Sequence, residues 1–244
     1  MRNGKAITDP TSGYNANDPF VNRDPRFNYT FIYNNSLWYS TSTGTKIAVN
    51  ISYTKNATTG VLTGQGDATL TWIAGYFWRK MMDDNTASNG GPNTERCLPL
   101  IRYAEILLNY AEASNESGNT AIAYDQLLLI RKRAGILPGS DGLYGLKASM
   151  TKDEMRETLQ NERMVELAYE DHRYFDVRRW KTAPQSQNFI MKAIRPIKTG
   201  SVFTYEIQPV AANSVHTFND AYYLFPIMQT ELGKNANLLQ NPGY

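Results

Sequence analysis

The sequence has little of what most catalytic and metal-binding sites require. Its single cysteine, Cys97, excludes an internal disulfide framework and any Cys-x-x-Cys metal site, and we expect it to be a small buried residue. Only His172 and His216 are available to a Ser-His or Cys-His pair, and neither lies in a recognisable motif. Nucleophile elbows, phosphate-binding loops and dinucleotide fingerprints are also missing. We predict a protein that is not an enzyme, with no catalytic residues, no metal and no cofactor, although a glycosidase needs only two carboxylates and no such motif.

Strong charge and long hydrophobic runs are missing too. The 244 residues carry a net charge of +2 and no block of like charges, which argues against a nucleic-acid partner. No apolar run approaches the roughly 18 residues that a membrane span needs. The first residues, MRNGK, contain neither a signal-peptide core nor a cysteine for lipidation. We therefore expect this chain itself to be soluble.

Apolar residues recur with helical period over one long region, residues 98–180. A first helix is expected at about residues 100–117, with an inward face of Ile101, Ala104, Leu108 and Ala111. Gly118 ends it, and Asn119 can cap a second helix that closes at Gly135. Small residues where the two helices must approach predict a tetratricopeptide-type helical hairpin.

A third helix is predicted to begin at the capping box of Thr151 and Glu154 and to run to about residue 169, before a separate segment at 172–180. Its expected inward residues are Met155, Leu159, Val165 and Ala168. Glu162, Glu166 and Glu170 recur every four residues, where like charges repel by a few tenths of a kcal/mol. We interpret them as a structural network paired with Arg163, Arg173, Arg178 and Arg179. The alternative is a carboxylate site for acid–base or metal chemistry, although a di-iron bundle fails because position 169 is Tyr rather than His.

Residues 1–97 are rich in Gly, Asn, Thr, Asp and Pro between short aromatic runs, which predicts loops and short strands, one of them from Phe27 to Tyr33. A sugar ring is bound by a flat aromatic side chain with amides, carboxylates or arginines around it. The candidate ligand-binding residues are Tyr33, Asn34, Trp38, Tyr39, Trp72 and Tyr76. The alternative is that such aromatics pack in the core, as we expect for Trp72 and Trp78. Because Trp38 and Tyr39 are adjacent, a strand would point them to opposite faces, so at least one is expected to be exposed.

Four blocks in the helical region, in this order, resemble the C-terminal half of the SusD/RagB family. They are RYAEILLNYAEA at 102–113, IRKRAG at 130–135, NERMVELAYE at 161–170 and HRYFDVRRW at 172–180. DPRF at 24–27, IYN at 32–34, GYFWRK at 75–80, YLFPIMQTE at 223–231 and the final NPGY look similar to further pieces of the family. Two positions depart from its pattern, because Met228 and Ala236 stand where prolines are usual.

This resemblance implies a fold and a division of the chain. The fold would be mainly α, part of a SusD-like α-α superhelix of tetratricopeptide-like hairpins, with a loop-rich region of short β-strands. Residues 1–97 would form the ligand-side region, 98–180 the helical scaffold, and 181–244 an irregular C-terminal segment packed on the same domain. Roughly the N-terminal half of the family's chain, including its lipid anchor, would be absent here.

The resemblance also implies a function. The protein would lie at the outer membrane on the cell surface, as the glycan- or nutrient-binding component of a SusCD-type uptake system. It would capture oligosaccharide or polysaccharide for a SusC-like TonB-dependent transporter. Alternatives are a related binder of peptides or other nutrients, a tetratricopeptide scaffold for protein partners, and a glycoside hydrolase. The hydrolase would use carboxylates among Asp83, Asp84, Glu95 and the helical glutamates.

Overall fold

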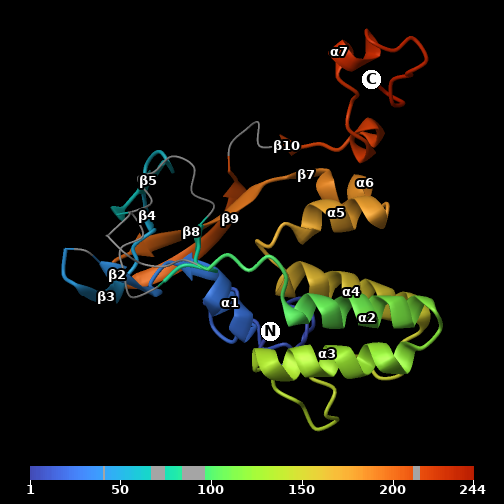
Figure 1. Cartoon of the computed structure of the whole chain (residues 1–244). Coiled ribbons are helices and arrows are strands. Elements are labelled where there is room, and N and C mark those ends of the chain that lie inside the picture. Colours follow the sequence, from blue (N-terminus) through green and yellow to red (C-terminus); the bar gives the residue numbers. More distant parts are fainter. Residues whose placement is uncertain (41, 67–74, 84–96, 211–214) are drawn as a thin grey trace.

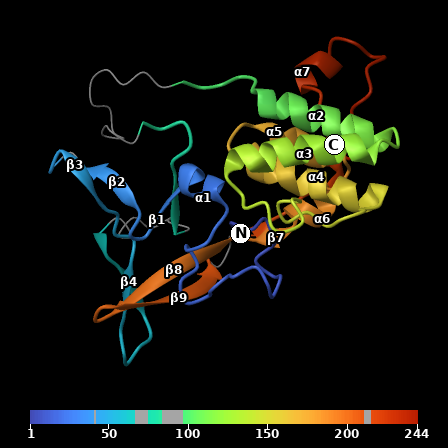
Figure 2. The ribbon, with the colours of Figure 1, turned by 90° about the horizontal axis from the view of Figure 1, so that it is seen from below.

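The computed structural model describes residues 1–40, 42–66, 75–83, 97–210 and 215–244. A layer of long helices lies on one side and several small sheets on the other (Figure 1). The N-terminal segment lies between them, as a second view from below also shows (Figure 2). The described residues therefore form a mixed α/β structure rather than the mainly α structure that we expected.

The helical layer contains the predicted hairpin. It consists of helices α2 (Tyr103–Glu116), α3 (Thr120–Ala134) and α4 (Lys152–Glu166). Gly118, with φ of 92°, follows α2, and Gly135 caps α3 in the left-handed conformation that glycine adopts most readily. Thr151 and Glu154 exchange both hydrogen bonds of a capping box at the start of α4. The hairpin and the capping box are thus confirmed.

The helices bury one shared core. Its fully buried members include Leu108, Ala111, Leu127, Met155 and Leu159. These side chains recur at helical spacing, which is why the sequence pattern predicted them correctly.

Two details of the predicted helices are wrong at their ends. Ile101 precedes α2 and is 72% exposed rather than inward. The helix α4 ends at Glu166 rather than near residue 169, because Tyr169 and Asp171 adopt positive φ angles that a helix cannot contain. Val165 and Ala168 are consequently half-buried.

Shorter helices follow along the chain. These are α5 (His172–Arg179), α6 (Ala183–Gln187), a 3₁₀ helix at Asp220–Tyr223 and α7 (Gln229–Leu232). The end of the chain, residues 220–244, lies beyond α5 and α6, away from the sheets of the N-terminal part (Figure 1). In the described part of the chain no helix combines the length and the apolar character needed to cross a membrane.

The expected strand from Phe27 to Tyr33 is helical over most of its length. Helix α1 spans Pro25–Thr30, and only Phe31–Tyr33 form a strand, β1. The Asp24 carboxylate accepts a hydrogen bond from the backbone N–H of Arg26, at 3.0 Å, and so caps the helix. Pro25 stands at the first turn, where its fixed φ suits a helix.

The strands form four small sheets among the described residues. Three are antiparallel pairs: β1 with β6 (Tyr76–Trp78), β2 (Leu37–Ser40) with β3 (Thr45–Ala48), and β7 (Phe189–Ile190) with β10 (Val215–His216). The fourth has the order β5 (Leu62–Gly64), β4 (Tyr53–Lys55), β8 (Lys192–Thr199) and β9 (Val202–Pro209). Strand β8 pairs in parallel with β4, Ile197 opposite Tyr53. The segment expected to be irregular therefore supplies the two longest strands.

An aromatic core joins the N-terminal segment to this sheet. Phe20, Phe27 and Ile194 are its buried members, and the rings of Tyr76 and Tyr205 pack around them. Phe20 meets Tyr205 edge to face, with ring centroids 5.3 Å apart. This core holds α1 against β8 and β9.

Cys97, expected to be buried, is exposed instead because it precedes the first buried turn of α2.

Candidate ligand-binding groove

Trp38 and Tyr39 lie in the hairpin of β2 and β3 rather than in a loop. Trp38 is 8% exposed, lies opposite Ile47, and has the Arg79 guanidinium carbon 5.7 Å from its ring centroid. Its ring therefore offers a sugar no open face. Tyr39, opposite Lys46, is the more exposed of the pair and is half-buried.

Asn34 and Tyr76 are also placed inside the structure. Asn34 is 2% exposed, and its Oδ1 accepts a hydrogen bond from the backbone N–H of Ile51 at 3.1 Å. Its buried Nδ2 has no hydrogen-bond partner among the described residues. Tyr76 lies half-buried in the aromatic core, where burial raises the pKa of its hydroxyl. Asn34 thus orders a turn, and Tyr76 packs.

Trp72 and Trp78 are the two tryptophans that we expected to pack in the core. Trp72 lies outside the described residues. Trp78, expected to pack, is 45% exposed and stacks on Tyr169 with ring centroids 5.4 Å apart. It packs on one face only.

Tyr33 lines a groove of about 650 Å³. It lies between the loop before α1, α1 itself and the C-terminal end of α3, which are side by side in both views (Figures 1 and 2). Its lining residues are Arg2, Phe20, Val21, Asn22, Arg23, Pro25, Asn28, Tyr29, Tyr33, Arg133, Ala134 and Gly135. We call this the α1–α3 groove. Of the six predicted ligand-binding residues, Tyr33 contributes to it.

Tyr29 is the exposed aromatic of the groove, and the sequence prediction missed it. Helix α1 buries Phe27 and Thr30, so Tyr29 points outward with 71% of its surface exposed. The guanidinium of Arg79 lies 5.9 Å from the Tyr29 ring centroid and donates a hydrogen bond to the carbonyl of Asn28, at 2.6 Å. Tyr29 also lines a smaller hollow of about 190 Å³ above Arg102 and Glu166. The ring therefore stands between two hollows.

Tyr33 supplies a polar group beside Tyr29. Its ring packs on Phe20 and Phe27, with centroids 4.6 and 5.2 Å apart, while its hydroxyl donates to Oδ1 of Asn28 at 3.0 Å. Burial raises the pKa of this hydroxyl, so it remains a neutral donor at physiological pH. The Tyr33 and Asn28 pair is suited to meet the hydroxyl rim of a sugar.

The three helical glutamates are buried in a charge network, as the structural interpretation predicts. Glu162 pairs with Arg26 at 2.6 Å and with Arg131 at 2.8 Å. The other ion pairs run from Glu166 to Arg26, Arg102 and Arg133, and from Glu170 to Lys80 and Arg102.

The predicted partners of these glutamates are wrong. Arg163 pairs instead with Asp176 at 3.0 Å, and Arg179 pairs with Glu112 and Asp176. The Arg178 guanidinium lies over the ring of Tyr174, 3.5 Å from its centroid. Arg163 and Arg179 lie near the glutamates in sequence, but their carboxylate partners belong to α2 and α5 instead.

The network also determines how the glutamates titrate. Burial alone would raise the pKa of Glu166, but hydrogen bonds from Arg133 and Arg26 outweigh it and hold the pKa below its ordinary value. Hydrogen bonds from Arg102 and Lys80 do the same for Glu170. A general acid of a glycosidase needs a raised pKa, so these two carboxylates are unsuited to that role.

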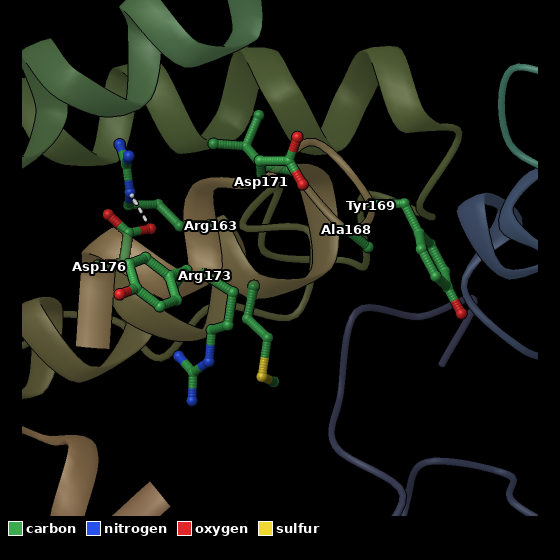
Figure 3. A pocket seen from close by; sticks show the side chains of 9 residues that line it. Arg163, Ala168, Tyr169, Asp171, Arg173 and Asp176 are labelled. Carbon is green, nitrogen blue, oxygen red and sulfur yellow. Dashed lines mark hydrogen bonds and ion pairs between the residues drawn. The ribbon is translucent and has the colours of Figure 1, made fainter. Parts of the chain in front are cut away.

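A smaller pocket of about 230 Å³ lies at the junction of α4 and α5 (Figure 3). The ion pair of Arg163 and Asp176 lies along one side, and the ring of Tyr169 points away from that pair. Both charged groups are buried and already paired. Two tyrosines line this pocket, Tyr169 and Tyr174, and they are 50% and 40% exposed, less than Tyr29.

The described residues also bear on metal binding and hydrolysis. In the part of the chain that the structure describes, no three His, Cys, Asp or Glu side chains gather as a metal site. Two carboxylates of the hydrolase alternative, Asp84 and Glu95, lie outside the described residues. His172 lies 3.5 Å from Glu105, and His216 stacks on Phe189.

Known proteins resemble this chain in sequence and in structure. The family model described as the SusD family matches residues 1–244. The chain is 32% identical over 159 residues to SusD-like protein P2 of Formosa agariphila, which covers 64% of this chain and 28% of that protein. A crystal structure of a SusD-like protein from Bacteroides fragilis has a TM-score of 0.71 at 28% identity, covering 92% of this chain and 39% of that one.

A SusD homolog from Bacteroides thetaiotaomicron, with a TM-score of 0.54 and 22% identity, shares the fold and covers 91% of this chain and 41% of its own. The chain therefore spans less than half the length of these relatives. Proteins of the SusD family are outer-membrane-associated lipoproteins that bind nutrients or glycans rather than transform them. The match over its whole length places this chain in the SusD/RagB family.

Proposed function

We propose that this chain captures oligosaccharide in the α1–α3 groove, as part of a cell-surface protein that supplies a SusC-like TonB-dependent outer-membrane transporter. One observation carries the proposal. The Tyr29 ring is 71% exposed at a groove that the Tyr33 and Asn28 polar pair also lines, beside that ring. The family relationship supplies the class of ligand.

The groove has the size and chemistry that a short oligosaccharide needs. Binding sites for small molecules enclose about 300–1,000 Å³, a range that includes this groove. A sugar presents an apolar C–H face, which stacks on a flat ring such as Tyr29, and a rim of hydroxyls. Around Tyr29 the groove offers the amides of Asn22 and Asn28 and the guanidinium of Arg133 to that rim. Aromatic stacking and polar groups therefore meet at one place.

The mechanism we propose is binding without chemistry. The helical glutamates are paired with arginines, and the lowered pKa values of Glu166 and Glu170 keep them ionised. A single exposed ring gives weak, readily reversible binding, which suits a protein that passes its ligand to a transporter. The helical layer then serves as scaffold.

Affinity electrophoresis tests the proposal. The chain is run through native gels containing starch, pectin, xylan, mannan or mucin glycans, and through a gel without polymer. We expect at least one polymer to retard it, and the variant Tyr29→Ala to weaken that binding about tenfold through loss of the stacking face. Tyr103→Ala is the matched control, because Tyr103 is 75% exposed on α2, outside the groove lining.

Three outcomes would contradict parts of this proposal. Equal retardation of Tyr29→Ala and the wild type would place the site elsewhere. Sustained release of reducing ends from the retarding polymer would reveal a hydrolase. A folded chain that no polymer retards, but that a peptide mixture protects from thermal unfolding, would favour the peptide-binding alternative.

A further inference from the structure

The α1–α3 groove is positively charged and lacks acidic groups of its own. Arg2, Arg23 and Arg133 line it, and none of the lining residues is Asp or Glu. For a chain with a net charge of only +2, this is a local concentration of one sign.

Arg2 is held in place by its backbone and leaves its side chain open. Its N–H donates to the carbonyl of Asn22, and its own carbonyl accepts from Leu137, both at 2.8 Å. These two hydrogen bonds fix the residue between the loop before α1 and the segment after α3. The Arg2 side chain is exposed and makes no ion pair within the described ranges.

Arg23 is oriented by neutral groups alone. Its Nη1 donates to the carbonyl of Pro19 at 3.0 Å, and its guanidinium carbon lies 4.4 Å from the ring centroid of Phe27. Among the described residues no carboxylate lies within ion-pair distance of it. The guanidinium is therefore positioned without being neutralised.

The nearby acids are not part of the groove lining. Asp24 forms an ion pair with Arg26 at 2.7 Å, and Glu166 is buried behind Arg133. Asp18 is close enough to raise the pKa of Tyr33, but it is not part of the groove lining. The carbonyl end of α3 carries a partial negative charge at the groove, and the basic residues of its last turn offset it.

We propose that the groove selects acidic oligosaccharides, with a carboxylate or sulfate group of the sugar held by Arg2 and Arg23 while a ring of the ligand lies on Tyr29. This inference rests on the sugar-binding function proposed above and names its substrate class. Guanidinium groups bind carboxylate and sulfate oxygens through paired, charge-assisted hydrogen bonds. A neutral sugar would desolvate the same arginines without supplying a counter-charge, so the groove disfavours it.

Matched oligosaccharides test the inference by isothermal titration calorimetry. One pair is oligogalacturonate and the same oligomer with its carboxyl groups reduced to alcohols. The other is a sulfated galactan oligomer and its desulfated form, so the two pairs distinguish carboxylate from sulfate. We expect the acidic member of at least one pair to bind about tenfold or more tightly than its neutral form. Its affinity should fall as salt is raised, because exposed charges are screened.

Variants of the groove assign the effect to residues. Arg2→Gln and Arg23→Gln should each reduce the ratio of acidic to neutral affinity about tenfold. Lys132→Gln is the control, because it removes the same charge from an exposed position one residue away from the lining residue Arg133. Because the Arg2 side chain makes no hydrogen bond or ion pair to the described residues, Arg2→Gln remains informative even if Arg23→Gln impairs folding.

The outcomes separate this inference from the proposed function. Equal affinity for the acidic and neutral members, with binding still dependent on Tyr29, would overturn selection by charge and leave sugar binding intact. A second outcome is that Lys132→Gln lowers the ratio of acidic to neutral affinity as much as Arg2→Gln does. That result would show that net charge alone causes the preference, and it would also overturn selection by the groove. No binding of either member, together with no retardation in any gel, would overturn the sugar-binding function itself.

Discussion

Two arginine-rich places lie side by side in this protein and differ in one respect. Around Glu162, Glu166 and Glu170 the chain supplies a buried carboxylate to each cation. In the α1–α3 groove it supplies none within the lining. Arg133 belongs to both, since it pairs with Glu166 and lines the groove. An arginine therefore stabilises the fold where the chain gives it a carboxylate partner, and is available to a ligand where the chain gives it none.

The buried network fastens distant parts of the chain together. Arg26, in α1, reaches Glu162 and Glu166, which lie 136 and 140 residues further along. Lys80 donates hydrogen bonds to the carbonyls of Glu166 and Ala168. The N-terminal, strand-rich part is thus tied to the end of α4. A buried ion pair adds little net stability when it forms, but removing one partner leaves uncompensated charge.

Breaking the network should have the largest effect. Glu166→Ala leaves Arg26, Arg102 and Arg133 without this carboxylate, and we expect the free energy of unfolding to fall by about 3–5 kcal/mol. Thermal and urea unfolding measure it. Glu157→Ala is the control, because Glu157 is an exposed residue of the same helix. A variant as stable as the wild type would show that water satisfies these arginines, and the contrast with the groove would disappear.

Acid should weaken the network by a smaller amount. Glu166 and Glu170 have pKa values held below the ordinary value of 4.5, so both bind protons less readily in the folded state than in the unfolded state. Their contribution is fully present above about pH 4.5 and is lost as the pH falls through the lowered values. We expect urea unfolding to show stability falling below about pH 4.5, with a shallower fall in Glu166→Gln. Parallel curves for the two proteins would contradict this assignment.

The sequence predicted best what depends on neighbouring residues. The core of α2, α3 and α4 repeats at helical spacing, and the capping box of Thr151 and Glu154 lies within one turn, so both were correct. Helix α1 carried a local pattern as well, since Asp24 and Pro25 form a typical helix start. We predicted a strand there instead, because aromatic residues alternate from Phe27 to Tyr33.

Contacts between distant residues could not be predicted in the same way. Nothing near Glu162 in sequence indicates Arg26 as its partner, and nothing near Tyr53 indicates the strand that pairs with it through Ile197. For the groove, Tyr33 was predicted and Tyr29 was missed. In a strand, the two tyrosines would lie on the same face as Phe27 and Phe31. In the helix at 25–30, Phe27 is buried and Tyr29 points outward.

The residue shared by the two places gives the finest test of their independence. The Arg133 side chain is 55% exposed, so solvent screens its ion pair with Glu166. If Arg133 is replaced, Glu166 still pairs with Arg26 and Arg102. We expect Arg133→Gln to cost about 1 kcal/mol of stability or less. It should weaken binding of acidic oligosaccharide several-fold, because one groove cation is lost. Lys132→Gln should change neither quantity. The contradicting outcome is that Arg133→Gln destabilises the protein as much as Glu166→Ala does. The groove would then be an extension of the buried network, because an arginine that is needed for folding cannot exchange its carboxylate partner for a ligand.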